Sequence, residues 1–456
     1  FVLCGCLTLS ASATVTTNAN SDLVFSGLSA ALTYTIPANE TATFRRITTT
    51  GEKTVTVSGG TNSRLKLMGS GSVSPIDNTA SSSSAVGFKF NVPVDLAATD
   101  AAGGVTVLVL GGSTFTKPVT LTESTKPLSV RRRNAVLLKF DGAGCVVDFS
   151  TAAKVEIGQP GTDYKGVKTT VDNGARLSLP ETVIGKASSL TVDNASTVTI
   201  NGDLTAPDGT YKTGGTVYAA VLKVGHASSL TCRRFVESKT DGLSASLENG
   251  SLFTATDGIE LHSLSGKPFL IGTGTVRTPD FNTKGSQPAS LLNTLTFDTQ
   301  DLVTRVGKLV VTNDVTKTRT VSVVGGGSVE FVEPVSLPNL KLVAKTTLLF
   351  DRVQTTRAPI EVQNLILPEE GQAKLKVVNR MISGSATLAT GGITQDQLAA
   401  LDLDIPAGST LSVEDGDLVF SVEEDLTLPA RAVYDTDGWT CYNVRGELLD
   451  GTEPNE

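Results

Sequence analysis

Short segments in which apolar and hydroxyl-bearing residues alternate run through most of this chain. In three of them, a turn-forming Asn is followed by apolar residues at the fourth and sixth positions after it. The three segments are Asn173 with Leu177 and Leu179, Asn194 with Val198 and Ile200, and Asn249 with Phe253 and Ala255. Alternation with a period of two predicts β-strands with one buried face, and Asn suits the positive φ of a tight corner.

Two spacings connect these segments. Asn194 follows Asn173 by 21 residues, and Gly-Lys-Ala-Ser-Ser-Leu-Thr at 185–191 returns 40 residues later as Gly-His-Ala-Ser-Ser-Leu-Thr at 225–231. Because the longer step is close to twice the shorter one, the sequence predicts coils of about 20 residues. One coil cannot bury its apolar face, whereas stacked coils can, so we expect an all-β fold, a β-solenoid of the parallel β-helix type. An array of antiparallel β-sandwiches is the alternative.

The repeat divides the chain into four expected segments. Residues 1–13 are a signal remnant or an N-terminal docking strand, and residues 14–127 are a β-rich region, either a separate domain or a cap. The β-solenoid is expected over 128–430, and an acidic C-terminal cap or tail over 431–456. Caps are expected because the last coil of a solenoid otherwise presents open strand edges.

Three further stretches carry local signals. The Ser/Gly-rich stretch 70–84 is expected to be a loop. Residues 394–401 are the best helix candidate, with Thr394 and Gln397 as a possible capping box. Residues 409–413 and 417–422 are expected to resume the coil-like alternation.

The N-terminal stretch 1–9 is apolar, and Ala11, Ser12 and Ala13 follow it as a small-residue cleavage pattern. Two interpretations stay open. The stretch is either the tail of a secretory signal or a mature start whose apolar strand docks into another subunit. Both predict an extracellular or cell-surface protein.

The net negative charge of the chain argues against nucleic acid as a partner. The 456 residues carry 38 Lys and Arg against 46 Asp and Glu, a formal net charge of −8. No overall basic field exists to attract nucleic acid, and no apolar stretch is long enough to span a bilayer. The expected partners are other copies of the chain, with glycans as a further candidate.

Three cysteines remain once residues 1–13 are set aside: Cys145, Cys232 and Cys441. An odd number in an exported chain allows one disulfide and one unpaired thiol. The alternative is that all three are small buried residues.

Three Asn residues begin Asn-x-Ser/Thr sequons and are candidate glycosylation sites in a eukaryotic host: Asn39, Asn194 and Asn249. Asn194 and Asn249 also occupy the turn position of the repeat, which explains them without a glycan.

A parallel β-helix raises the alternative of a glycan-cleaving enzyme, which needs carboxylates as acid and base or around calcium. Asp257, Glu260 and His262 are the best group of this kind, and Glu260 and His262 would share one strand face. Outward polar residues on the flank of a solenoid are the simpler interpretation. His226 is expected to be exposed, because its turn position matches that of Lys186. We therefore expect no catalytic residue and a protein that is not an enzyme.

Metal and anion signals are weaker still. The triple Arg at 131–133 indicates a processing site, an anion patch or a solvated turn. Asp-Thr-Asp-Gly at 435–438 resembles part of a calcium loop, but the remaining spaced ligands are missing. Two His and no Cys pair separated by two residues predict no zinc site. We expect no metal and no cofactor.

The stretch 190–204, Leu-Thr-Val-Asp-Asn-Ala-Ser-Thr-Val-Thr-Ile-Asn-Gly-Asp-Leu, resembles the passenger repeats of secreted β-helical adhesins and autotransporters. The resemblance implies an exported, elongated scaffold and carries over no catalytic residue. The C-terminal end departs from the autotransporter pattern, because it is a short acidic tail and not a long set of amphipathic strands.

Three functions follow, in order of preference. The first is an extracellular structural protein, a subunit of a surface filament, appendage or coat assembled through β-strand contacts. The second is an adhesin or glycan-binding module. The third is a β-helical polysaccharide lyase or hydrolase.

Overall fold

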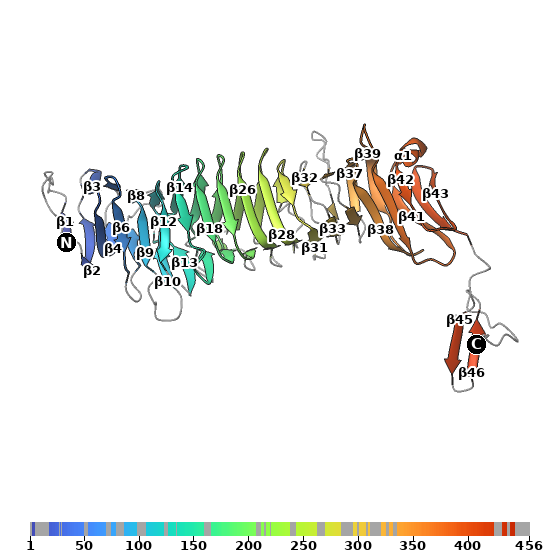
Figure 1. The fold of residues 1–456 in the computed structure, drawn as a ribbon, viewed down its shortest axis with the longest axis horizontal. Helices are drawn as coiled ribbons and strands as arrows, with labels where there is room; N and C mark the ends of the chain where they lie inside the picture. Colours follow the sequence, from blue (N-terminus) through green and yellow to red (C-terminus); the bar gives the residue numbers. More distant parts are fainter. Residues whose placement is uncertain are drawn as a thin grey trace.

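The protein is an elongated rod of stacked coils, seen in a computed structural model (Figure 1). The structure describes residues 2–4, 18–26, 28, 30–49, 53–69, 74–78, 86–97, 106–122, 126–133, 135–158, 166–206, 211–213, 216–218, 220–237, 243–261, 270–283, 295–298, 301–306, 309–310, 321–324, 328–331, 335–423, 431–435 and 438–442.

Three parallel ladders of strands run along the rod, and each coil contributes one strand to each ladder. Ladder 1 is a ten-stranded sheet of β3 (Leu32–Ile36), β5 (Val55–Gly59), β8 (Phe88–Asn91), β11 (Ser113–Phe115), β14 (Leu137–Asp141), β17 (Lys168–Asp172), β20 (Ser189–Val192), β25 (Ala220–Val224), β27 (Leu243–Leu247) and β29 (Leu270–Gly272).

Ladder 2 follows ladder 1 in each coil. Its strands are β6 (Arg64–Leu67), β9 (Val94–Ala97), β12 (Val119–Thr122), β15 (Val146–Asp148), β18 (Arg176–Leu179), β21 (Thr197–Ile200), β30 (Thr275–Arg277), β32 (Leu295–Asp298) and β35 (Val321–Val324).

Ladder 3 completes each coil. Its strands are β1 (Val2–Cys4), β2 (Asn18–Ser26), β7 (Ile76–Asn78), β10 (Thr106–Val109), β13 (Pro127–Arg131), β16 (Lys154–Ile157), β19 (Thr182–Ile184), β22 (Leu204–Ala206), β31 (Asp280–Thr283), β33 (Asp301–Val306), β36 (Ser328–Phe331), β38 (Thr347–Val353), β40 (Lys374–Asn379) and β42 (Asp402–Asp404).

Some strands bend from one ladder into the next or extend the stack toward the C-terminal end. They are β4 (Thr41–Thr49), β26 (Ser229–Glu237), β28 (Leu252–Leu261), β34 (Leu309–Val310), β37 (Val335–Leu342), β39 (Ile360–Ile366) and β41 (Gly384–Thr390). Two short antiparallel hairpins, β23 (Tyr211–Thr213) with β24 (Thr216–Tyr218) and β45 (Arg431–Asp435) with β46 (Gly438–Tyr442), form sheets of their own.

The predicted β-solenoid is confirmed, and so is its shortest repeat. Lys168 in β17 pairs with Ser189 in β20, a step of 21 residues. The apolar positions of the Asn repeat are buried and aligned, because Leu177 pairs with Val198 and Leu179 with Ile200. Each coil buries its inward residues against its neighbours, which gives one continuous core.

The C-terminal end of the stack is closed by a different arrangement. β44 (Asp417–Val422) pairs antiparallel with both β41 and β43 (Ser409–Glu414), whereas 409–422 was expected to continue the coils. The helix α1 (Gln395–Ala399) lies beside it, and its predicted capping box is confirmed: the Gln397 N–H donates to Thr394 Oγ1 at 3.2 Å, and the Thr394 N–H to Gln397 Oε1 at 2.9 Å. An antiparallel hairpin breaks the parallel repeat, so this cap lies before the predicted one at 431–456.

One predicted loop is a strand in the structure, and one predicted segment boundary is not marked by the strand pairing. Residues 74–78 were assigned to a loop, but β7 lies there as a buried strand of ladder 3. The pairing also crosses residue 128 without a break, since β10 pairs with β13 and β12 with β15. Strand pairing marks no boundary there, and the division into four segments stays a prediction.

Candidate functional site

A ridge of tight turns runs along the edge of the rod where ladder 1 meets ladder 2. Each turn spans four residues, and at least one of its first three residues takes a positive φ. The turns are residues 37–40, 60–63, 142–145, 172–175, 193–196, 225–228 and 248–251. Asn39, Asn62, Asn173 and Asn194 have φ between 51° and 62°, which Asn tolerates better than most residues.

The same hydrogen bond joins three pairs of successive turns. The N–H of the third residue donates to the carbonyl of the second residue in the next turn. The bonds are Asn39 to Thr61 at 2.8 Å, Gly174 to Asn194 at 2.9 Å and Ala195 to His226 at 3.2 Å. Among the described residues, three of the five pairs of successive turns on the ridge share this bond.

Side chains add a second series of bonds along the ridge. Asn194 Nδ2 donates to Asp172 Oδ1 at 2.7 Å, and Lys139 Nζ lies 2.9 Å from Asp172 Oδ2. Burial alone would raise the pKa of Asp172, but the hydrogen bonds from Lys139 and Asn194 outweigh it and hold this pKa below its ordinary value. The carboxylate is thus a structural acceptor.

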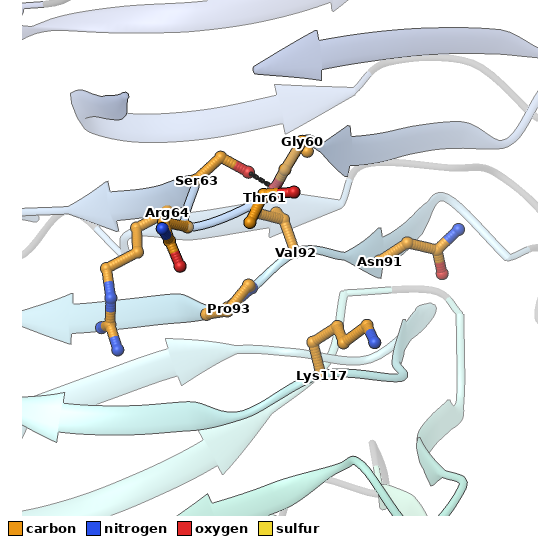
Figure 2. A pocket seen from close by; sticks show the side chains of 10 residues that line it. Gly60, Thr61, Ser63, Arg64, Asn91, Val92, Pro93 and Lys117 are labelled. Carbon is orange, nitrogen blue, oxygen red and sulfur yellow. Dashed lines mark hydrogen bonds between the residues drawn. The ribbon is translucent and has the colours of Figure 1, made fainter. Parts of the chain in front are cut away.

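The ridge is interrupted over two consecutive coils. Between the turns at 60–63 and 142–145, the chain passes from β8 to β9 through Val92-Pro93, and from β11 to β12 through Thr116-Lys117-Pro118. No turn protrudes in either coil. The result is an open groove of about 530 Å³, which we call the notch, lined by residues 59–64, 91–93 and 117 (Figure 2).

The wall of the notch toward the N-terminal end is the turn Gly60–Ser63. Ser63 Oγ donates to the Gly60 carbonyl at 2.8 Å, and a Cβ on Gly60 would come within 2.9 Å of the Ala38 backbone. This close packing of turn on turn requires Gly60. The turn is thereby held rigidly against the preceding coil.

The other sides of the notch carry polar and cationic groups. Figure 2 shows Arg64 at one end, Asn91 at the other and Lys117 opposite the turn, with Val92 and Pro93 between them. Arg64 Nη1 donates to both oxygens of Asp95, at 2.7 and 2.8 Å. Asn91 Oδ1 accepts from Thr116 Oγ1 at 2.8 Å. Lys117 is exposed, and it has no ion-pair partner within the described part of the chain.

A short repeat in the sequence marks the notch. Phe-Asn-Val-Pro-Val-Asp-Leu at 90–96 returns as Phe-Thr-Lys-Pro-Val-Thr-Leu at 115–121. In both copies the Pro carbonyl accepts a hydrogen bond from the preceding coil, Leu65 N–H to Pro93 and Val94 N–H to Pro118, each at 2.9 Å. Pro replaces the turn with a direct bend.

The carboxylate group predicted near residue 260 does not form a defined site among the described residues. Asp257 lies on the surface, and Arg233 Nε is 3.9 Å from its carboxylate. Gly258 and Ile259 separate it from the partly buried Glu260 within β28. His262 lies outside the described residues.

His226 is exposed as expected, but the reason given for it is wrong. Its turn belongs to the ridge beside Asn194, and His226 Nδ1 lies 3.1 Å from the Asn249 carbonyl. Lys186 instead lies in the turn from ladder 3 to ladder 1, because Ser189 pairs with Val221 while Ser229 pairs with Thr197. The 40-residue offset therefore does not connect equivalent coil positions.

The triple Arg at 131–133 takes part in a network that ties ladder 3 together. Arg133 Nη2 donates to Asp77 Oδ2 at 2.7 Å, and Arg46 Nη1 lies 3.9 Å from the same oxygen. Arg46 and Arg45 both bind Asp22, through their Nε atoms at 2.9 and 2.6 Å. The Arg45 hydrogen bond outweighs the effect of burial and, with Arg46, lowers the pKa of Asp22. Arg133 is thus a structural ion-pair partner of Asp77.

Cys145 and Cys232 are both free and buried. Burial raises the pKa of the Cys145 thiol to about 12 and that of Cys232 further still. Neither forms a disulfide in this structure, which agrees with the small-buried-residue alternative. Cys441 lies in β46, and nothing is described of its side chain.

The three candidate glycosylation sites, Asn39, Asn194 and Asn249, are exposed on the ridge. Their modification stays a prediction. Asn194 Nδ2, the atom that would carry a glycan, is engaged with Asp172.

No group of three or more His, Cys, Asp or Glu side chains among the described residues is placed to hold a metal ion. None of the helices in this part of the chain is both long and apolar enough to cross a membrane.

Comparison with known proteins produced no match: no family model, no curated protein and no solved structure resembles the chain significantly. The solenoid architecture that the repeat spacing predicted is shared with the β-helical adhesins that the sequence resembles. Membership in that family has no support from these comparisons.

Proposed function

We propose that this protein is an extracellular structural rod, a subunit of a surface filament, appendage or coat. The observation that carries the proposal is the continuity of ladder 3, which pairs strand to strand from β1 at one end to β42 at the other. With one core shared by all coils, bending the rod requires breaking backbone hydrogen bonds or opening apolar contacts. A stiff spacer is the role that suits this construction.

The two ends of the rod suit a directional assembly. At the C-terminal end, β44 covers β41 with an antiparallel pair, so this strand cannot add a further parallel neighbour. Among the described residues, β3 in ladder 1 pairs only with β5, and at the C-terminal end β42 in ladder 3 likewise pairs only with β40. Terminal strands of this kind accept strands from other chains. We therefore propose that the assembling contacts use strand edges of this kind.

Electron microscopy of the purified native protein tests the proposal most directly. Rods or filaments of uniform width are expected, and deletion of residues 1–13 should abolish filaments while circular dichroism still shows β-structure. Deletion of residues 424–456 is the matched control and should leave assembly intact. Normal filaments from the N-terminal deletion would contradict strand docking through that segment, and compact single particles would contradict a filament role.

The proposal includes that the protein is not an enzyme. It is supported by the position of Asp257, whose side chain is 50% exposed beside Arg233, far from the water-excluded setting in which carboxylates become strong acids or bases. Incubation with acidic polysaccharides should produce no new reducing ends or unsaturated products. Turnover that Glu260→Gln abolishes would establish an enzyme instead.

A further inference from the structure

We infer that the notch is a binding site for an acidic saccharide unit, a sugar ring carrying a carboxylate or sulfate. This inference goes beyond the structural role and does not depend on it. It begins with the repeated backbone bond of the ridge. Asn62 is the third residue of its turn, as Asn39 is in the turn before. In three other turns the corresponding N–H donates to a carbonyl in the next turn, but the coil after Asn62 has no turn.

The Asn62 N–H therefore has no acceptor within the described part of the chain. It lies at the surface, so water satisfies it in the free protein. Where the ridge is continuous, a carbonyl oxygen occupies the corresponding position. The notch thus presents a fixed N–H where an oxygen atom of a ligand can take the place of the missing carbonyl.

Neighbouring side chains extend this donor into a polar site. Asn91 Oδ1 is held by Thr116, and Asn91 Nδ2 has no acceptor among the described residues. Thr61 adds an exposed hydroxyl on the turn. A saccharide ring offers several hydroxyl groups that both donate and accept, which matches an amide N–H, an amide NH₂ and a hydroxyl around one groove.

Charge indicates that the saccharide is acidic. The two cations of the lining differ, because Arg64 is neutralised by two hydrogen bonds to Asp95 whereas Lys117 has no carboxylate partner in the described part. A carboxylate or sulfate on the ligand would supply that partner. The chain as a whole carries a net charge of −8, so an acidic ligand is repelled from most of the surface and favoured at this cation.

Size and composition of the notch set the strength of binding. A groove of about 530 Å³ lies in the range of small-molecule sites. No aromatic side chain lines it, so stacking on a sugar face is absent. A single unit should bind weakly, with a Kd on the order of 1 mM, or about −4 kcal/mol. Repeated rods on a surface would strengthen the attachment by multivalency.

Saturation-transfer NMR of the full chain tests the inference, with tetragalacturonate as the acidic probe and maltotetraose as the neutral one. Binding of tetragalacturonate is expected, with at least tenfold weaker binding of maltotetraose. Lys117→Glu should weaken the acidic probe by at least tenfold. Asn91→Leu should weaken it by severalfold without unfolding, because Thr116 Oγ1 keeps the Phe90 carbonyl as an acceptor.

Lys341→Glu is the matched control, since Lys341 is an exposed lysine on β37 outside the notch, and it should leave binding unchanged. Sodium sulfate separates the acidic group from the sugar. If sulfate alone competes at the same concentration as tetragalacturonate, the notch is an anion site and the saccharide assignment is wrong. Absence of tetragalacturonate binding, or binding that Lys117→Glu leaves intact, would also overturn the inference.

Discussion

The coils at residues 18–141 and those at 166–261 follow the same three-strand path but are stabilised differently. In the first region, ladder 1 has an aromatic interior: the Phe90 and Phe115 rings stack with centroids 4.7 Å apart, and Phe140 continues the stack at 5.6 Å. In the second region, Val171 and Val192 occupy the same column. A parallel ladder therefore tolerates either interior, provided that each coil matches the volume of its neighbours.

The two regions also differ along their outer edges. The second region has turns in every coil, joined by Asn side chains and backbone bonds, whereas the first region lacks turns in two coils and relies on the Asp22 and Asp77 ion pairs. The notch lies where two consecutive coils lack the turn. In this rod, the proposed ligand site therefore lies where the repeat is irregular.

The largest expected effect comes from the aromatic interior. Phe90→Ala should cost about 3–5 kcal/mol, because the cavity lies between two stacked rings that cannot close it. Val192→Ala in the same column should cost about 1.5 kcal/mol, from the smaller buried area. Urea denaturation followed by circular dichroism measures both. Equal losses would show that the two interiors contribute alike.

The second effect concerns the ion pairs of the first region. Asp77→Asn should cost about 1.5–3 kcal/mol, because this carboxylate has an 8% exposed side chain and binds Arg133. Asp148→Asn is the control, since Asp148 is exposed and its carboxylate bonds, within the described part of the chain, only to the nearby Ser150. The thermal midpoint of each variant is the measurement. If Asp148→Asn lowered the thermal midpoint as much as Asp77→Asn, the ion-pair network would not be the source of the stabilisation.

The third effect tests the ridge of the second region. Asn194 has a φ of 51°, so Asn194→Val should cost about 1–2 kcal/mol through strain in the left-handed conformation. Asn194→Gly removes the same bond to Asp172 without that strain and should cost less. Thermal melts of both variants separate strain from hydrogen bonding. If the Gly variant loses as much as the Val variant, the side-chain bond is the dominant contribution.

The smallest effect is a dependence on acid. The pKa values of Asp22 and Asp172 are lowered in the folded protein, so above the unfolded value near pH 4 both carboxylates contribute their full stabilisation. This contribution falls as the pH drops through the lowered folded-state values. Melting temperatures at pH 7 and pH 3 should show the loss, and Asp22→Asn should narrow the difference between them. An unchanged difference in that variant would place the acid-sensitive groups elsewhere.

The two copies of the motif that are 40 residues apart show that a local sequence can specify a turn without specifying its position in the coil. Gly-x-Ala-Ser at 185–188 and at 225–228 forms the same turn twice, with Ala187 and Ala227 at φ 58° and 53°. In both, the Ser N–H donates to the Gly carbonyl, at 3.0 and 3.2 Å. The motif specifies a turn, but nothing within it specifies which corner of the coil the turn occupies. Residues 207–219 lie between the two copies and change the spacing.

β7 was missed for a related reason. Residues 74–78 contain Ser, Pro, Asp and Asn, which indicate a loop when taken alone. Asp77 is buried because Arg133 and Arg46 reach it from residues 56 and 31 positions away, and Ser74 Oγ accepts the Val109 N–H at 2.9 Å. Partners that far along the chain cannot be inferred from composition.

By itself, the sequence determined the fold class, the buried positions of the Asn repeat and the capping box of α1. Each of these depends on residues close together in the chain, through alternation of side chains or a bond three positions away. Only the tertiary structure decided which corner each turn occupies, which strand closes the stack and where the ridge is broken. Those features arise when coils of unequal length are brought into register, so that residues about one coil apart become neighbours.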